Sequence, residues 1–221
     1  MKNRVPLILS LNGGYVDTAG FLALHGLFTT HVTGNFVTFG ASLAHGTSGA
    51  VTKLLALPVF CIIVVLAQML DASLTKRGYS AFRLMLGVKV ALLALGAALA
   101  IHLGPFPDGD AWPILLTGMV LVSAMAIQNA MHRIHLASAP PSTVMTLTTT
   151  QIMLDVALFV RPAPAEARAA AKTRMSRMIP SVTAFAIGCA LAALLYVLGG
   201  MWFFVVPPLI AVLPIWLGEA G

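Results

Sequence analysis

The sequence predicts an all-α integral membrane protein, with six transmembrane helices and two re-entrant half-helices arranged as two inverted repeats. Of its 221 residues, 59% are hydrophobic and only 9% are charged, whereas an ordinary soluble domain carries about 25% charged residues. The mean hydropathy of +0.94 covers the whole chain and leaves no room for a separate soluble domain. We therefore expect residues 1–221 to form one membrane domain, and we read the net charge of +6 as loop charge, not as a nucleic-acid surface.

The lengths of the apolar segments separate spanning from non-spanning helices. Eight apolar segments cover residues 5–27, 33–47, 51–71, 82–103, 112–135, 143–160, 180–199 and 201–217. A helix needs about 20 residues to cross the hydrocarbon core. The segment 33–47 would cover only about 22 Å as a helix, and the segment 143–160 begins within the hydroxyl-rich run PPSTVMTLTTTQ. These two segments are predicted to be re-entrant, and the other six to span.

The basic residues predict the orientation, because cytoplasmic loops carry an excess of Lys and Arg. Those in the predicted loops and at the segment ends are Lys2, Arg4, Lys76, Arg77, Arg83, Arg133, Arg161, Arg168, Lys172, Arg174 and Arg177. The connection between 82–103 and 112–135 carries Asp108 and Asp110 instead. All the basic clusters lie in the cytoplasm only if 33–47 enters from outside, 143–160 enters from inside, and both termini are cytoplasmic.

The order of the segments predicts an internal repeat, with units at about 5–103 and 112–217. Each unit has a long span, a polar half-segment and two further spans. Asp17 aligns with Asn129, and HVTGNFVTFG (31–40) aligns with TVMTLTTTQI (143–152). Three spans per unit make the second unit inverted relative to the first. Inverted repeats with discontinuous helices are typical of transporters, whose sites lie near the membrane midplane.

Three stretches also carry a family resemblance. GYVDTAGFLALHGLFTTHVTGN (14–35), AMAIQNAMHRI (124–134) and TVMTLTTTQIMLDVAL (143–158) resemble the YoaK-like family of small bacterial inner-membrane proteins. The resemblance covers nearly the whole chain. It implies about six membrane helices and a multi-pass protein of the bacterial inner membrane, and it supplies no function.

Asp17 is the most informative polar residue, because it lies about twelve residues into the first span, near the midplane. A carboxylate there costs about 2.5–3.5 kcal/mol on insertion scales, and such residues usually face a cavity. We expect a proton or cation site, or one end of a polar site that includes Tyr15 and Thr18. The alternative is a structural hydrogen bond to loosened backbone at Gly13 and Gly14.

The starts of the two half-helices form the second candidate feature. We expect Gly34 to make a sharp turn, with Thr33 or Asn35 as the N-cap. Ser142 or Thr143 is expected to cap the second half-helix. Two buried helix N-termini would favour an anion or a carbonyl oxygen. Alternatively, the threonine hydroxyls bond only to their own helices.

Together these arguments predict a solute site. It comprises Tyr15, Asp17, Thr18, His31, Thr33, Gly34, Asn35, Gln128, Asn129, Thr143 and Thr146. Gln128 and Asn129 are expected to face Asp17 as uncharged donors. Lys89 is expected to extend toward the membrane surface.

The remaining polar residues have structural interpretations. Asp155 is expected to pair with a nearby Arg. His132 and His135 lack a third ligand, so we expect no metal and no cofactor. The segment 165–178 is either a basic helix on the anionic lipid surface or an ordinary cytoplasmic loop.

These features favour a membrane transporter or channel for a small solute, which is anionic or carboxylate-bearing and proton-coupled. The alternative is a partner-binding or assembly protein whose polar stripes hold helices together. An intramembrane enzyme fits less well, because the chain has no HExxH, Ser–His or Cys–His arrangement and no second Gly-x-Gly-Asp motif. The expected partners are the lipid bilayer, a small-molecule solute and a second copy of the chain, since six spans is small for a carrier.

Overall fold

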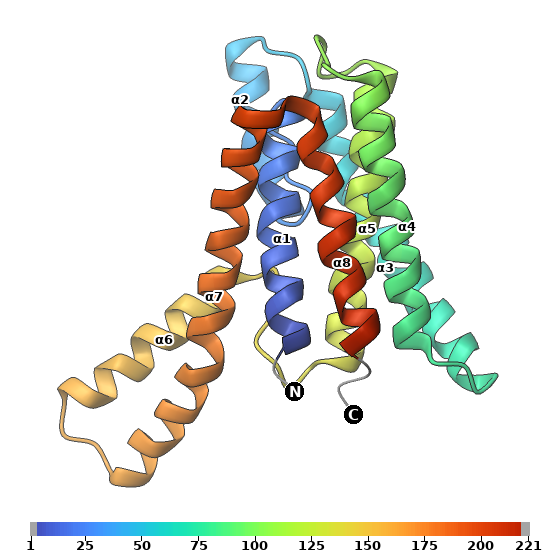
Figure 1. Cartoon of the computed structure of the whole chain (residues 1–221). Helices are drawn as coiled ribbons and strands as arrows, with labels where there is room; N and C mark the ends of the chain where they lie inside the picture. Colours follow the sequence, from blue (N-terminus) through green and yellow to red (C-terminus); the bar gives the residue numbers. More distant parts are fainter. Residues whose placement is uncertain (1–3, 218–221) are drawn as a thin grey trace.

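The protein is a bundle of long helices, as the computed structural model describes for residues 4–217 (Figure 1). Its described residues form no strands. The elements are α1 (Arg4–Ala23), η1 (Val32–Gly34), α2 (Asn35–His45), α3 (Ala50–Lys76), α4 (Ala81–Leu103), α5 (Trp112–His135), α6 (Met145–Val160), α7 (Ala165–Gly199), η2 (Gly200–Val205) and α8 (Val206–Leu217). The first residue of α1, the last of α8 and the α6–α7 connection lie at the same end of the bundle.

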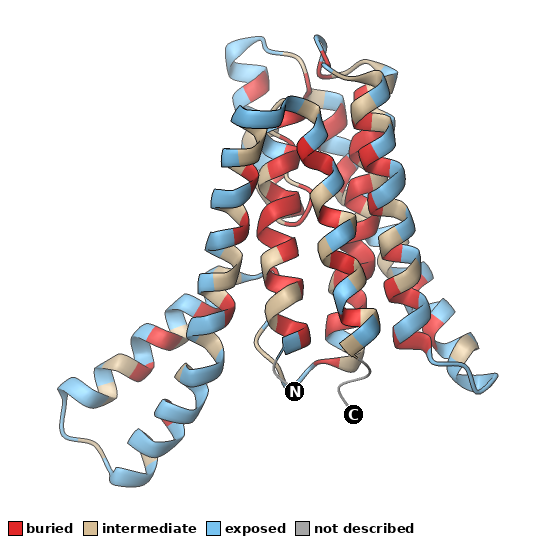
Figure 2. Ribbon diagram, in the orientation of Figure 1, coloured by how far each residue is buried: buried red, intermediate tan, exposed pale blue. Residues whose placement is uncertain are grey.

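The first and fifth helices form the centre of the bundle. α1 packs against α7 and α8, whereas α5 packs against α3 and α4. The short helix α2 lies on α3, and the short helix α6 lies on α7. Figure 2 shows that buried residues are concentrated on α1 and α5, while the outer helices present exposed faces. The two most enclosed helices are therefore the two that carry Asp17 and Asn129.

Two glycines bring the backbones of α1 and α7 into direct contact. A Cβ atom on Gly14 would lie 2.1 Å from the carbonyl oxygen of Phe185. A Cβ atom on Gly188 would lie 2.0 Å from the carbonyl oxygen of Leu11. No side chain fits at either position, so the closest crossing in the bundle centre requires glycine on both helices.

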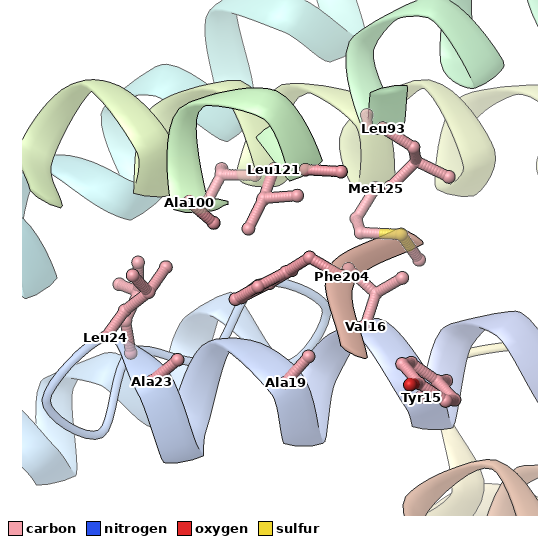
Figure 3. Packing of buried hydrophobic residues seen from close by; sticks show 14 of the residues in the cluster. Tyr15, Val16, Ala19, Ala23, Leu24, Leu93, Ala100, Leu121, Met125 and Phe204 are labelled. Carbon is pink, nitrogen blue, oxygen red and sulfur yellow. The ribbon is translucent and has the colours of Figure 1, made fainter. Parts of the chain in front are cut away.

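Beside this crossing, a hydrophobic cluster joins α1, α4, α5 and η2. Figure 3 shows the ring of Phe204 lying between Val16 and Ala19 of α1 on one side and Leu121 and Met125 on the other. Phe204 is only 1% exposed. Phe204 of η2 thus fills the space between α1 and α5 and packs against both helices.

The apolar helices have the lengths that membrane spans require. Four stretches of the described residues are long and apolar enough to cross a membrane, namely Ala50–Lys76, Ala81–Leu103, Trp112–His135 and the combined stretch Ala165–Leu217. The prediction of an all-helical protein with several long apolar helices is confirmed. α1 is not one of these four stretches, because its polar residues lower its hydropathy. Three of them, Ser10, Asn12 and Asp17, are buried within the bundle.

Several predicted boundaries were wrong. The first helix ends at Ala23 and not at 27, because His25 and Gly26 have positive φ angles of 52° and 80° that turn the chain. The seventh helix begins at Ala165 and not at 180, so the basic segment 165–178 belongs to one continuous helix that includes Pro180. The last segment begins as the 3-10 turn η2 before α8.

Candidate functional site

The carboxylate of Asp17 is bonded by the linker that follows α1. Its Oδ1 accepts hydrogen bonds from the backbone N–H of Thr30, at 2.7 Å, and of His31, at 3.3 Å. Its Oδ2 lies 2.6 Å from Nδ1 of His31. The residue is 5% exposed. This arrangement satisfies a buried acid and joins it to a titratable ring through one hydrogen bond.

The ring of His31 connects Asp17 with the periphery of the bundle. It makes edge-on contacts with Phe28 and Phe185, at centroid distances of 6.4 and 5.6 Å. The side chain of His31 is 37% exposed, compared with 6% for that of Asp17. The imidazole is therefore the part of the Asp17–His31 pair that reaches the surface of the bundle.

A matching arrangement joins α5 to the linker before α6. Oγ1 of Thr143 donates to Oδ1 of Asn129 at 2.6 Å, and Nε2 of Gln128 donates to Oγ of Ser142 at 3.1 Å. The separation of Asn129 and Thr143 along the chain is 14 residues, as it is for Asp17 and His31. The aligned positions of the two predicted repeats thus make the same contact, with an amide in place of the acid.

The first linker (residues 24–31, between α1 and η1) and the second linker (residues 136–144, between α5 and α6) both reach the same residue of α1. Oγ1 of Thr30 lies 3.4 Å from the carbonyl oxygen of Gly13. A Cβ atom on Gly13 would lie 2.9 Å from the carbonyl oxygen of Ser142 and 3.7 Å from Cγ2 of Thr143. The first linker and the second therefore both lie against Gly13, one helical turn from Asp17.

Lys89 is buried at the α4–α5 contact, which corrects the expectation that it extends to the surface. It is 0% exposed, and its Nζ donates to Oε1 of Gln128 at 2.5 Å. Nε2 of Gln128 donates in turn to the carbonyl oxygen of Leu9 at 2.9 Å. Among the described residues, Lys89 forms no ion pair with an acid.

The expected caps of the two half-helices were wrong. Gly34 has a φ angle of −63°, so it makes no left-handed turn, and it is the N-cap of α2 without a side-chain bond. Thr33 lies within η1. Oδ1 of Asn35 accepts a hydrogen bond from the backbone N–H of Phe28 at 2.8 Å, and Nδ2 of Asn35 donates to the carbonyl oxygen of Phe28 at 2.7 Å. These two bonds tie the start of α2 to the first linker.

The second half-helix is likewise not capped by a hydroxyl. The N-cap of α6 is Val144, which has no side-chain bond, because Ser142 and Thr143 bond to α5 instead. Thr146 in the first turn of α6 is exposed and lies outside these contacts. Its carbonyl oxygen accepts a bond from Thr150 of the same helix.

Four other predicted site residues have partners other than Asp17. Tyr15 is 0% exposed, and its hydroxyl donates to the carbonyl oxygen of Phe203 in η2 at 2.8 Å. Thr18 lies on α1 near Cys189 of α7, whose thiol bonds to the carbonyl oxygen of Gly14 at 3.4 Å. Gln128 and Asn129 bond to the second linker, so the expectation that they face Asp17 as donors was wrong.

Polar contacts also fasten the outer helices. Asp155 of α6 accepts bonds from Arg174 of α7, as its predicted pairing with an Arg requires. Sequence reasoning missed two contacts, Lys53 with Ser42 at 2.6 Å and His135 with Asp71 at 2.7 Å. The sequence signal that could have found both contacts is a charged residue inside an apolar segment, because Lys53 and Asp71 both lie within 51–71. The described residues contain no group of three metal-ligating side chains.

Asp110, in the α4–α5 connection, caps the start of α3. Its carboxylate accepts bonds from the backbone N–H of Gly49 at 2.9 Å and of Val51 at 2.8 Å. Burial raises the pKa of Asp110, but the backbone donors of Gly49, Thr52, Val51 and Ala50 outweigh burial and hold this pKa below its ordinary value. Asp110 therefore attaches the α4–α5 connection to the start of α3. This connection lies at the end of the bundle opposite to the start of α1.

The chain was compared with protein-family models, curated proteins and solved structures. No curated protein and no solved structure matches it. The family described as "Protein of unknown function (DUF1275)" matches residues 5–217, which include both linkers and every residue of the predicted site. The match is consistent with the resemblance to YoaK-like proteins. The chain therefore belongs to the DUF1275 family.

Proposed function

We propose that the protein is a membrane transporter or channel for a small anionic solute, with proton coupling through Asp17 and His31. The observation that carries the proposal is the pair formed by the buried Asp17 and the half-buried His31, one turn from Gly13, which both linkers contact. Ionisable residues inside a membrane domain are costly and commonly mark a pathway for ions or protons.

The helix contacts support the two inverted repeats. α1 of the first unit packs against α7 and α8 of the second, while α5 of the second unit packs against α3 and α4 of the first. The pairs Asp17–His31 and Asn129–Thr143 occupy corresponding positions. In transporters built from inverted repeats, the solute site lies between corresponding helices of the two units.

The six-span topology rests on helix length and loop charge. The helical stretch Ala165–Leu217 has 53 residues, more than twice the number that one crossing requires, and its apolar part follows Arg177. It reverses direction at η2, so α7 and α8 run antiparallel (Figure 1). We assign α1 as a sixth span that is shielded from lipid by α5, α7 and α8. The bundle end with Arg4 is then cytoplasmic.

Thiol labelling tests this topology. Single cysteines at 107–110 and 163–175 in a cysteine-free chain would be treated with a membrane-impermeant reagent on intact cells. We expect labelling at 107–110 and none at 163–175. Labelling of 163–175 from outside would refute the re-entrant assignment of α6, and with it the inverted repeat.

The charges of the centre favour an anionic solute. Asp17 is already matched by His31, whereas Lys89 is bonded only to the neutral side chain of Gln128. A buried ammonium group without an acid is unfavourable unless a negative charge accompanies it or its proton is lost. An anion bound beside Ser142 would lie at the end of the hydrogen-bonded chain Lys89–Gln128–Ser142, and its negative charge would lower the electrostatic cost of the buried ammonium group.

Uptake by purified protein in liposomes tests the function. Small organic anions would be screened with and without an inward proton gradient, using Asp17→Asn and Thr146→Ala as matched variants. Asparagine retains an oxygen for the N–H groups of Thr30 and His31 but does not titrate. We expect Asp17→Asn to keep the melting temperature within about 3 °C, a change of about 1 kcal/mol, and to lose gradient-driven uptake.

Thr146→Ala should transport as the parent does, because Thr146 is exposed and outside the described contacts. Full gradient-driven uptake by Asp17→Asn would refute the coupling role. Failure of every anion to enter liposomes would favour the second candidate, an assembly protein.

One observation favours that second candidate. The side-chain partners at the centre are largely within the protein, as in the bonds of Asn129 with Thr143 and of Gln128 with Ser142. Such bonds can serve as interhelical attachments. An assembly protein would lose stability and self-association together when Asn129 is changed, with no solute uptake in the parent protein.

A further inference from the structure

A separate cavity lies at the bundle end that carries Arg4, between the second linker and α7. Its volume is about 250 Å³. The lining residues that matter here are Ser138, Pro140, Thr173, Arg174, Arg177 and Met178. The Asp17 site does not share these residues, so the cavity has no part in the proposed coupling.

The two arginines of the cavity differ in their charge balance. Arg174 donates from Nε to Oδ2 of Asp155 at 3.1 Å, and from its terminal nitrogen to Oδ1 at 2.5 Å. Asp155 is 1% exposed, so this pair is fixed and neutral overall. The side chain of Arg177, one turn further along α7, is exposed and forms no hydrogen bond or ion pair with the described residues. The cavity therefore carries one uncompensated positive charge.

The chemistry of the lining suits a phosphate group. A guanidinium offers planar paired donors that match phosphate oxygens. The hydroxyl of Ser138 has no partner among the described residues and can add a donor. A volume of about 250 Å³ lies just below the range of about 300–1,000 Å³ for sites of drug-sized ligands. It is adequate for a compact anionic group.

We propose that this cavity binds a phosphate-bearing anion through Arg177, with Arg174 held in place by Asp155 as a second donor. Basic pockets between helices at the cytoplasmic side of a membrane protein characteristically accept anionic headgroups. Exposed apolar side chains on the adjoining α6, such as Leu147 at 69% and Leu154 at 60%, can lie against acyl chains. The two sources of the phosphate are an anionic phospholipid headgroup and free phosphate.

Binding to the purified full chain in neutral detergent tests this proposal. Dihexanoyl phosphatidylglycerol and inorganic phosphate would be titrated separately, at about 0.15 M ionic strength so that distant charges are screened. The variants are Arg177→Gln and, as a matched control, Lys172→Gln. Lys172 is exposed on the opposite side of α7 from the lining residues, and its replacement removes the same charge.

We expect Arg177→Gln to weaken binding about tenfold, as loss of one charge-assisted contact implies, and Lys172→Gln to weaken it less than about twofold. Arg177→Lys should retain part of the affinity, which separates charge from folding. Arg177-dependent binding of the phospholipid alone identifies a lipid site, and equal dependence for inorganic phosphate identifies a free-phosphate site. Equal effects of the two glutamine variants, or no binding of either ligand, would overturn the proposal.

Discussion

Replacement of Gly188 by Ala should force α1 and α7 apart. The new Cβ atom would lie 2.0 Å from the carbonyl oxygen of Leu11 and 2.9 Å from the backbone nitrogen of Tyr15. Cβ contacts below 3.0 Å are essentially never seen, so the two helices must separate by 1.0 Å, the difference between 3.0 and 2.0. The obstacle is backbone, so no change of side-chain rotamer can relieve it.

The expected cost follows from this geometry. Overpacking a tight core costs about 1–3 kcal/mol, and a backbone obstacle places Gly188→Ala at the upper end of that range. A loss of about 3 kcal/mol lowers the melting temperature of a protein of this size by roughly 6–12 °C. The shift would also move the linker contacts at Gly13, because Gly13 lies on the displaced stretch of α1.

Thermal unfolding of the purified protein measures the effect, with Gly87→Ala as the control. Gly87 is also within a helix, but a Cβ atom there meets nothing within 4 Å. Alanine at that position should stabilise the helix by about 0.5–1 kcal/mol. If Gly188→Ala melts at or above the temperature of Gly87→Ala, the close contact between α1 and α7 is refuted.

Three further changes test the polar contacts. Asp110→Asn should cost about 1 kcal/mol at neutral pH, as loss of a helix cap does. Because the folded-state pKa of Asp110 is lowered, its contribution is present above the unfolded value of about 4 and disappears as the pH falls through the folded value. The difference in melting temperature between pH 7 and pH 3 should therefore be smaller for Asp110→Asn than for the parent protein. Arg174→Gln leaves the Asp155 carboxylate buried without a cation, so hydrogen exchange should accelerate in α6 more than for Asp155→Asn; equal protection in both variants would contradict this. Lys89→Met should keep the fold, because the lost bond to Gln128 is offset by the removal of a buried amine, and liposome uptake should lose its preference for anions. Unchanged selectivity would exclude Lys89 from the solute site.

Apolar length and turn residues were sufficient to locate most helices. The segments predicted at 82–103 and 112–135 correspond to α4 at Ala81–Leu103 and α5 at Trp112–His135. The predicted start of the seventh helix was wrong for a physical reason. The stretch AEARAAAKTRMSRM is rich in Ala, which favours helix, but its charges remove it from any search by hydropathy.

The side-chain partners could be predicted only in part. Asp155 was expected to pair with an Arg because it lies near the inner end of its segment, close to the basic connection that follows. Which Arg it pairs with, Arg174, was not predicted. The partners of Asp17 depend on how far the linker returns into the bundle, which the pattern of residues does not specify. Lys89 illustrates the same point, since only the rotation of α4 against α5 decides whether its ammonium group meets Gln128 or the membrane surface.

The enclosure of α1 has a consequence for biosynthesis in the membrane. Its main neighbour, α7, is made much later, and the contact between Ser10 and Ser181 joins residues 171 positions apart. At a synthesis rate of about 5–20 residues per second, α1 waits roughly 10–30 s for that neighbour. During this interval Asn12 and Asp17 lack the carbonyl of Pro207 and the full packing around the linker. We therefore expect α1, which carries these buried polar side chains, to stay at the insertion machinery or at the membrane interface until the last third of the chain arrives.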